Sequence, residues 1–299
     1  MRGLPFSGYD WWVKSSTSRV GPGPNYFSDS TSNVWTDAQG WLHLRITHRS
    51  NAWQCAEIVS ARTFGQGSCR FELATAADGL DSNTTLGLFT WSDDPAFAHR
   101  EIDVECARWG NPTDANNAQF VVQPYDPAGH LVRYRVPTTT TNSTHLFTWE
   151  TNRVGFQALA GAYMPDPAAS NVLAAWGFTN AAAVPQSGDE NVRLNLWLVN
   201  GNAPSSGREV EVVVKRFQFA PLGPPPPATL RGPKFSSKPA AFQFDLGTAP
   251  DFRYQVQRSS DRVVWPELAV LLATNDAATV QDTNAAASGA RFYRAVTLP

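Results

Sequence analysis

Three acidic residues alternate with apolar residues in the segment "HREIDVECARWG", residues 99–110. Side chains in a β-strand change face at every residue, so Glu101, Asp103 and Glu105 are predicted to share one face, with an apolar row on the other. Acidic residues are among the poorest strand formers, and three neighbouring carboxylates repel one another at neutral pH. Chemistry that uses paired carboxyl groups would explain why the chain tolerates this arrangement.

The spacing of the two glutamates is within reach of glycoside hydrolysis. The Cα atoms of Glu101 and Glu105 are expected roughly 13 Å apart in an extended strand, and leaning side chains bring the carboxyls to about 5–7 Å. Retaining glycosidases hold these groups about 5–5.5 Å apart and inverting ones about 6.5–9.5 Å, so the range fits the retaining class better but overlaps both. Crowding also predicts that at least one carboxyl pKa is raised, as a proton donor requires.

A purely structural explanation competes with the chemical one. Most isolated Glu-X-Asp-X-Glu segments are the solvated face of an edge strand, with the acids paired to Arg or Lys. This segment instead lies among apolar strands and follows the aromatic run "GLFTW", residues 87–91. The alternation of that run predicts that Phe89 and Trp91 share a face. These neighbours favour a site over a solvated face.

Short strand-like runs separated by turn signals occupy most of the chain, and helical periodicity is scarce. The runs of the first two thirds are "GWLHLRITHR" (40–49), "SCRFELATA" (68–76), "TTLGLFTWS" (84–92), "NAQFVVQPY" (117–125), "HLFTWET" (145–151), "NRVGFQALA" (152–160), "NVRLNLWLV" (191–199) and "REVEVVVKRFQFA" (208–220). Many short strands at this spacing predict an all-β jelly-roll sandwich rather than alternating β/α units.

Composition excludes several classes of protein. The chain has 299 residues, a formal net charge of −2 and a pI of about 6.2, so no basic surface for nucleic acid is predicted. No apolar run approaches the roughly 20 residues of a membrane-spanning helix, so no membrane insertion is expected. The start, "MRGLPFSGYDWW", lacks the apolar segment of a signal peptide, which suits either a cytoplasmic protein or a chain whose leader has been removed.

The cysteines and histidines predict neither a metal site nor a cofactor. Three cysteines cannot all pair within one chain, and although a Cys55–Cys69 bridge is compatible with the sequence, buried free thiols are the favoured interpretation. The five histidines form no zinc-like spacing with one another or with cysteine.

A proline run marks a predicted domain boundary. "PLGPPPPA", residues 221–228, favours a stiff extended linker between a first domain over residues 1–220 and a second over 229–299. The second domain has its own strand pattern, typical of a small antiparallel β-sandwich similar to immunoglobulin or fibronectin type III modules. Its segments "YQVQRSSDRVVWPEL" and "RFYRAVTLP" resemble a C-terminal module of secreted bacterial proteins. That resemblance implies a spacer or attachment role and a secreted, cell-surface or periplasmic location.

The acidic segment and its surroundings resemble the family 16 glycoside hydrolases, which include laminarinases, lichenases and xyloglucan transglycosylases. "EIDVE" (101–105) matches the family signature in the form of the lichenase and transglycosylase branch. Further segments resemble the family in the same order: "WQCAEIVSARTFGQGSCRFEL" (53–73), "HLFTWETNRVGFQALAG" (145–161) and "LNLWLVNGN" (194–202). The resemblance covers most of residues 25–220. It implies a curved, concanavalin A-like jelly roll whose concave face forms a cleft for a β-linked polysaccharide.

Carried over by position, the resemblance implies a role for each acid. Glu101 would be the nucleophile that forms a glycosyl-enzyme intermediate, and Glu105 the general acid and then the general base. Asp103 would hydrogen-bond to the nucleophile and help to set its protonation. The predicted substrate-binding residues, some from the resemblance and some from their place near the acids, are Glu57, Phe89, Trp91, His99, Trp109, Gln123 and Trp197.

The tryptophans have competing interpretations. Trp197 matches a cleft tryptophan of the family, but an ordinary core tryptophan is equally compatible with the sequence. Trp91 is favoured over Phe89 as a sugar platform because its indole also offers a hydrogen-bond donor. The tryptophans at positions 11, 12, 35 and 149 are predicted to lie in the core.

Departures from the family pattern surround the motif. Lichenases usually have Trp and Asp before it, whereas this chain has His99 and Arg100. On an ideal strand His99 would share the face of the acids, as a residue of the cleft rim, and Arg100 would point away from Glu101. The following segment, "CARWGNPTDANNAQF", is longer than in lichenases and is expected to reshape one end of the cleft. The usual partner position for a lichenase disulfide reads "YFS", so that bridge is not expected. No acidic cluster places the structural calcium ion that occurs in relatives.

The leading hypothesis is a monomeric retaining endo-β-glycanase acting on a β-1,3-glucan or a mixed-linkage β-1,3-1,4-glucan. A transglycosylase and a galactanase are the nearest enzyme alternatives within the fold. A carbohydrate-binding lectin that lost turnover is a different class, and the intact Glu-Asp-Glu set argues against it. A purely structural surface protein is a third class, and it would have to explain the three acids as the solvated face of a strand.

Overall fold

The computed structural model describes residues 1–137, 139–223, 227–237, 240–285 and 291–298. The chain divides into two compact units, Met1–Phe219 and Ala220–Pro299. The predicted linker, 221–228, includes residues 224–226, which lie outside the described residues. Within the described ranges, no helix is long and apolar enough to cross a membrane.

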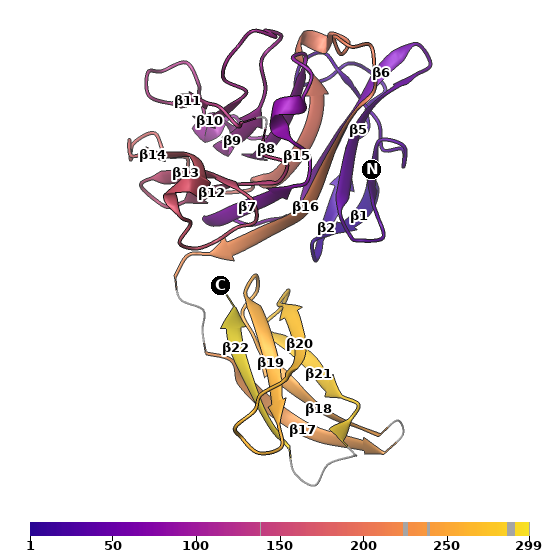
Figure 1. Cartoon of the computed structure of the whole chain (residues 1–299), viewed down its shortest axis with the longest axis vertical. Helices are drawn as coiled ribbons and strands as arrows, with labels where there is room; N and C mark the ends of the chain where they lie inside the picture. The colour runs from indigo at the N-terminus through magenta and orange to yellow at the C-terminus, as the bar shows by residue number, and fades with distance from the viewer. Residues whose placement is uncertain (138, 224–226, 238–239, 286–290, 299) are drawn as a thin grey trace. The chain divides into compact units, whose positions relative to one another are not determined.

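The first unit is a large β-sheet that folds over into two layers, as Figure 1 shows. One layer has the strand order β11 (Leu131–Tyr134), β10 (Ala118–Val122), β9 (Ile102–Cys106), β8 (Thr84–Trp91), β15 (Asn191–Leu198) and β6 (Ala52–Thr63). In addition, β6 pairs with β2 (Tyr9–Val13), and β2 pairs with β1 (Arg2–Phe6). The other layer has the order β5 (Leu42–Arg49), β16 (Val210–Pro221), β7 (Gly67–Leu73), β12 (Ser143–Trp149), β13 (Val154–Ala160) and β14 (Val172–Phe178), with β4 (Val34–Thr36) beside β5. The layers are joined where β5 pairs with β6, beside which β3 (Tyr26–Phe27) runs parallel.

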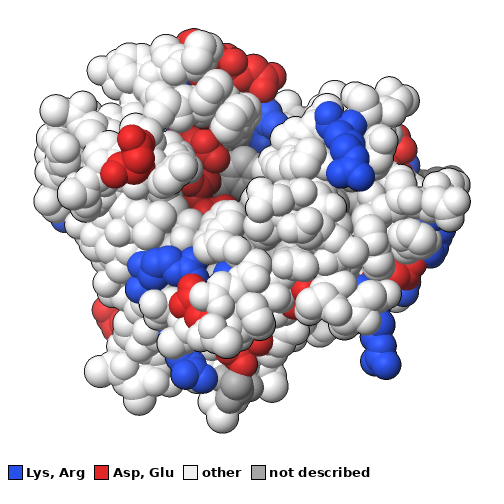
Figure 2. Space-filling view, turned by 90° about the horizontal axis from the view of Figure 1, so that it is seen from above, with Lys and Arg blue, Asp and Glu red and all other residues white. Residues whose placement is uncertain are grey.

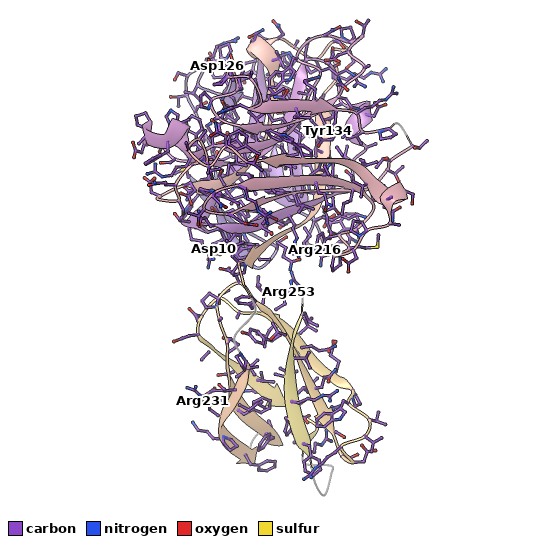
Figure 3. The ribbon with its side chains drawn as sticks, turned by 90° about the vertical axis from the view of Figure 1, so that its left-hand side faces the viewer. Asp10, Asp126, Tyr134, Arg216, Arg231 and Arg253 are labelled. Atoms are coloured by element: carbon purple, nitrogen blue, oxygen red, sulfur yellow. The ribbon has the colours of Figure 1, made fainter. Side chains whose placement is uncertain are left out.

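Aromatic side chains fill the space between the layers. Phe120 of β10 stacks on Phe156 of β13 with ring centroids 5.0 Å apart. Tyr134 of β11, labelled in Figure 3, reaches the opposite layer, where its hydroxyl lies 3.2 Å from Nδ1 of His145 on β12. Such pairs bury large apolar areas from both layers. The prediction of an all-β jelly roll is confirmed.

The core predictions for tryptophan are confirmed in part. Trp11 and Trp149 are each 1% exposed. Trp12 is 44% exposed, so its assignment to the core was wrong: β2 alternates between faces, and its neighbour Trp11 takes the inward position. Trp35 is half-buried and stacks on His43 at a centroid distance of 4.5 Å.

All three cysteines are buried and none forms a disulfide, as favoured from the sequence. The Cys55–Cys69 bridge that the sequence left open is therefore absent. The thiols instead occupy apolar positions on β6, β7 and β9.

The second unit contains two three-stranded antiparallel sheets. One has the order β17 (Thr229–Ser237), β18 (Ala240–Gly247), β21 (Ala277–Asp282), and the other the order β20 (Glu267–Leu272), β19 (Arg253–Ser259), β22 (Phe292–Leu298). Their core includes Phe244, Leu246, Tyr254 and Val256. A small antiparallel sandwich is therefore present, and the likeness to immunoglobulin or fibronectin modules stays a prediction.

Candidate active site

A cavity of about 440 Å³ opens on the face of β6, β8, β9 and β15 that lies away from the core. In the view of Figure 2 the first unit is hollowed, and acidic side chains gather in the hollow. The lining residues are Lys14, Gly21, Pro22, Glu57, Gly87, Phe89, Trp91, Asp93, Glu101, Asp103, Glu105, Arg193, Asn195 and Trp197.

The three predicted acids lie together in this cavity. The apolar residues of β9 are fully buried, while Asp103 and the half-buried Glu101 and Glu105 face the cavity. The central position of the strand is fixed on both sides, because Val104 pairs with Phe120 of β10 and with Leu88 of β8. A slip of one residue would turn the acids into the core, so the buried apolar row sets their direction.

The segment before Glu101 is a left-handed turn rather than a continuation of the strand. The four residues 97–100 of the 3-10 turn η2 (Ala96–Arg100) have φ between 50° and 61°. This conformation costs roughly 1–2 kcal/mol per residue outside glycine, so other contacts must hold it. The Ser92 amide donates to the His99 carbonyl at 2.7 Å, and Thr90 Oγ1 donates to the Arg100 carbonyl at 2.7 Å.

The turn overturns the predicted position of His99. Its side chain does not line the cavity; the imidazole stacks on Trp91 with centroids 4.2 Å apart and rings 7° from parallel. Alternation along a strand fails here because β9 begins only at Ile102. Arg100 does point away from Glu101, as predicted, and pairs with Asp94 at 3.3 Å and Asp189 at 3.7 Å.

Burial raises the pKa of all three acids, so the prediction that at least one would rise is confirmed. For Glu101 burial, followed by the charge of Glu105, raises the pKa to about 8, while a hydrogen bond from Asp103 opposes the rise. For Asp103 burial and the two flanking carboxylates raise the pKa well above its ordinary value. For Glu105 burial raises the pKa to about 7 against the hydrogen bond from Gln119. The ionisation of Glu101 and Asp103 therefore depends on the neighbouring acids, and the Asp103 carboxyl donates a hydrogen bond to Glu101.

Glu57 lies in the cavity wall, where its charge is compensated. The side chain is 1% exposed and pairs with Lys14 Nζ at 2.9 Å and Arg193 Nη1 at 3.5 Å. Asn195 Nδ2 donates to the same carboxylate at 3.4 Å, and its Oδ1 has no partner within the described residues. A Cβ at Gly87 would lie 2.5 Å from that oxygen, so glycine leaves room for the buried Asn195 amide beside Glu57.

The predicted aromatic residues divide into two groups. Trp91, Phe89 and Trp197 line the cavity, although Phe89 and Trp197 are mostly buried. Trp109 lies outside the lining, with its ring edge-on to Trp197 at 5.9 Å. Gln123 also lies outside it, and its Nε2 donates to Asp103 Oδ2 at 3.1 Å.

Sequence reasoning missed several polar residues of the cavity. Arg193 and Asn195 share the parity of Trp197 in "VRLNLWL", so alternation was a usable signal for both. Lys14 comes from a distant segment that no local pattern connects to the acids. Gln119, which contacts Glu105, lies on β10, the strand that pairs with β9. Its position opposite Glu105 depends on the long connection between these two strands.

Among the described residues, no group of three or more His, Cys, Asp or Glu side chains is arranged to hold a metal ion. No step below uses a metal.

Neither a protein-family profile nor a curated protein sequence matches the chain. Solved structures do match it. A β-glucanase of Bacillus licheniformis has 18% identity and a TM-score of 0.53, covering 74% of this chain and 97% of that one. A β-1,3-1,4-glucanase (lichenase) from a mouse hindgut metagenome has 17% identity and a TM-score of 0.53, covering 74% and 99%. An immunostimulatory antigen and pseudo β-1,3-glucanase of Mycobacterium tuberculosis has 18% identity and a TM-score of 0.51, covering 70% and 91%. At these identities the likeness shows that the first unit has the fold of these proteins.

Proposed function

We propose that the protein is a retaining endo-β-glycanase that hydrolyses a β-1,3-glucan or a mixed-linkage β-1,3-1,4-glucan. The observation that carries this proposal is the set of three carboxyls from one strand, facing one cavity, in the fold that the β-glucanases share. We further propose that it acts as a monomer on polysaccharide outside the cytoplasm.

The first half-reaction needs Glu101 ionised, with Asp103 and Glu105 protonated. The Glu101 carboxylate attacks the anomeric carbon while the bond from that carbon to the leaving oxygen breaks. Glu105 transfers its proton to the leaving oxygen, so the shortened glycan departs as an alcohol. The hydrogen bond from Asp103 and the charge of Arg193 both favour the anionic form of Glu101.

The second half-reaction reverses the role of Glu105. Its carboxylate takes a proton from water, whose oxygen attacks the anomeric carbon and releases Glu101 as a carboxylate. Two displacements at one carbon restore the original β configuration. Attack by a sugar hydroxyl in place of water would give transglycosylation at the same site.

The remaining cavity residues supply binding. Trp91 offers an aromatic face and Trp197 an edge of apolar surface to pyranose rings. Glu57, which lines the cavity, accepts hydrogen bonds from sugar hydroxyls. Lys14 and Arg193 pair with the Glu57 carboxylate in the cavity wall and fix its position.

A glycan-binding protein without turnover is the second candidate. One observation favours it: burial raises the pKa of Glu101 to about 8, so in the empty cavity this carboxyl holds its proton at neutral pH. The catalytic proposal requires that bound substrate shift the shared proton away from Glu101.

A substrate panel separates the candidates. The full chain is incubated with laminarin, barley mixed-linkage glucan, xyloglucan, agarose and carrageenan, and new reducing ends are measured beside Glu101→Gln and Glu150→Gln variants. We expect cleavage of a glucan, loss of at least 100-fold in the first variant, and no loss in the second. Cleavage of a galactan alone would replace the glucan assignment, and products longer than the substrate would indicate transglycosylation.

Two further results would count against the mechanism. Activity that survives Glu101→Gln would refute the nucleophile, and release of the inverted anomer, read by NMR, would refute the covalent intermediate. Binding to the panel without any turnover would favour the second candidate.

A further inference from the structure

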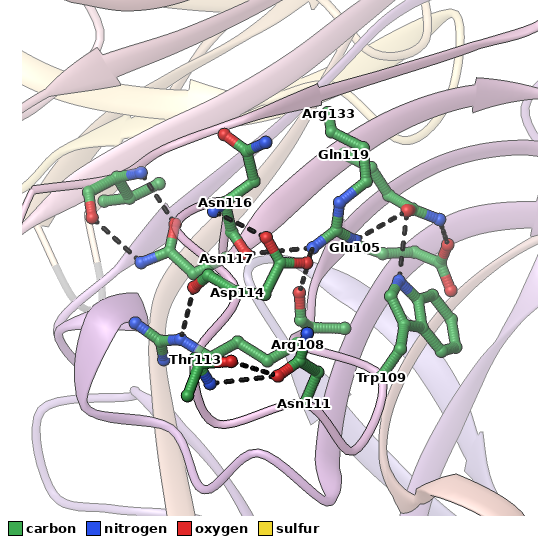
Figure 4. A network of polar contacts seen from close by, with 12 residues as sticks. Glu105, Arg108, Trp109, Asn111, Thr113, Asp114, Asn116, Asn117, Gln119 and Arg133 are labelled. Carbon is green, nitrogen blue, oxygen red and sulfur yellow. Dashed lines mark hydrogen bonds and ion pairs between the residues drawn. The ribbon is translucent and has the colours of Figure 1, made fainter.

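A row of polar side chains crosses three neighbouring strands beside the cavity, as Figure 4 shows. Glu105 of β9 pairs in register with Gln119 of β10, and Gln119 pairs with Arg133 of β11. Gln119 Nε2 donates to Glu105 Oε2 at 2.7 Å, and Arg133 Nη1 donates to Gln119 Oε1 at 3.0 Å. The two contacts connect Arg133 to Glu105 through a single amide.

The partners of Gln119 fix which way its amide faces. Trp109 Nε1 donates to Gln119 Oε1 at 3.1 Å, in addition to the bond from Arg133. Indole and guanidinium N–H groups are donors only, so the amide oxygen must face them. The amide NH₂ is then committed to Glu105, because a flipped amide would lose both bonds to its oxygen and point its N–H groups at two donors. Gln119 is 5% exposed, so water does not replace these partners readily.

Arg133 also organises the loop 107–117, which connects β9 to β10. Its Nη2 donates to Asp114 Oδ2 at 2.6 Å and to the carbonyls of Asn116 at 2.9 Å and Ala107 at 3.2 Å. One guanidinium thus holds both ends of the loop and its middle. The loop in turn carries Trp109, which has a φ of 53° that folds the indole back towards Gln119.

We propose that Arg133 is a positioning residue for the acid/base: through Gln119 it directs the Glu105 carboxyl, and through Asp114 it ties that carboxyl to the loop 107–117. This inference rests on the proposed function, in which Glu105 donates and then accepts a proton. Arg133 contacts neither the cavity nor Glu105 itself. It acts on the reaction through the amide that it orients and through its charge.

The electrostatic consequence has a definite sign. The charged groups around Glu105 are Glu101 just before β9, Asp103 on β9, Arg133 on β11, Arg193 on β15 and Glu57 on β6. Gly87 and Gln119 face it from the adjacent strands. The hydrogen bond from Gln119 and the charge of Arg133 both favour the ionised form of Glu105. Loss of Arg133 removes the charge and frees the amide to turn, so Glu105 should hold its proton to higher pH.

The test compares two arginines that anchor the same loop. Arg108 Nη2 pairs with Asp78 Oδ1 at 2.8 Å and has a side-chain exposure of 17%, against 21% for Arg133. Arg108 contacts neither Gln119 nor Glu105 within the described residues. We therefore compare Arg133→Met with Arg108→Met in the full chain, with Gln119→Met as an independent break in the row if Arg133→Met does not fold.

Two measurements are made on each variant. The pH dependence of kcat/KM on the cleaved glucan has an alkaline limb that reports ionisation of the acid/base. The carboxyl ¹³C resonance of Glu105, assigned by its loss in Glu105→Gln, reports the same ionisation without substrate. We expect both midpoints to rise by about one pH unit in Arg133→Met and Gln119→Met, and to stay unchanged in Arg108→Met.

The outcomes distinguish this inference from the proposed function. Equal behaviour of the Arg133 and Arg108 variants, with loss of stability but no change in midpoint, would overturn the positioning role. If no substrate is cleaved but the Glu105 resonance shifts as expected, the positioning role stands and the proposed activity fails. If Glu101→Gln abolishes cleavage but no variant of the row moves either midpoint, only the positioning role fails.

Discussion

Replacing Glu101 with Gln is expected to stabilise the first unit while it removes turnover. In the folded chain, burial and the charge of Glu105 raise the pKa of Glu101 from 4.5 to about 8. A carboxyl with a raised folded-state pKa keeps a proton that the unfolded chain has released. Its contribution to stability is therefore fully present below pH 4.5 and is lost as the pH rises towards 8. Gln has the same shape and no proton to lose.

The magnitude follows from the two pKa values. For a carboxyl that titrates alone, the loss is under about 1 kcal/mol at pH 5 and roughly 4–5 kcal/mol at pH 8.5. Here Asp103 and Glu105 share the proton equilibrium, so removing one of three groups recovers part of this energy. We expect Glu101→Gln to raise the free energy of unfolding by about 2 kcal/mol at pH 8.5 and by less than about 1 kcal/mol at pH 5.

Urea unfolding of the full chain at both pH values measures this difference. Tryptophan fluorescence reports the first unit, because ten of the eleven tryptophans lie in Met1–Phe219 and only Trp265 lies beyond it. The control is Glu150→Gln, since Glu150 pairs with Arg153 at the surface and its change should stay within about 0.5 kcal/mol. If the free energy of unfolding of Glu101→Gln rises equally at the two pH values, or more at pH 5, the raised pKa of Glu101 is refuted.

Three further predictions concern the cavity wall and the core. His99→Ala removes the ring stacked on Trp91, so we expect a loss of about 1 kcal/mol in stability. We also expect a several-fold higher KM for glucan with a smaller change in kcat. An unchanged KM would show that the stack does not position the Trp91 ring for sugar binding. Burial raises the pKa of the Cys55 and Cys106 thiols to about 12. A thiol reagent at pH 8 should therefore modify neither cysteine until urea unfolds the chain. Rapid modification of the native protein would contradict their burial. Glu57→Gln leaves the partly buried Lys14 and Arg193 without their charged partner, so we expect a loss of roughly 1–3 kcal/mol in urea unfolding and weaker glucan retention in affinity electrophoresis. Unchanged retention would remove Glu57 from the binding residues.

Much of the cavity could be predicted because it obeys the alternation of strands. The acids of β9 and the aromatic residues of β8 lie on the predicted face, since each strand has one fully buried row that fixes its direction. His99 does not follow this alternation. It lies in a run of four left-handed residues without a glycine, a conformation too rare to be predicted from sequence, so the strand was expected to continue through it.

The polar row through Gln119 could not be predicted for a different reason. Glu105 and Gln119 are neighbours only because β9 and β10 pair in one particular register after an intervening loop. The length of that loop is visible in the sequence, but the register it produces depends on contacts such as Arg133 with Asp114. The ionisation of the three acids likewise depends on burial in the assembled fold, although their crowding was apparent from spacing alone.

The left-handed turn before Glu101 has a consequence for how the protein fails on warming. Four successive residues in a disfavoured conformation make this turn a place where local opening costs less than global unfolding. Besides the bonds from Ser92 and Thr90, the turn is held by the pairs of Arg100 with Asp94 and Asp189, whose attraction weakens in salt. The proposed nucleophile, Glu101, therefore directly follows a strained segment of an otherwise well-packed wall. Inactivation by heat or salt should begin there. The turn would open reversibly and Glu101 would lose its position in the cavity, while the jelly roll stays folded.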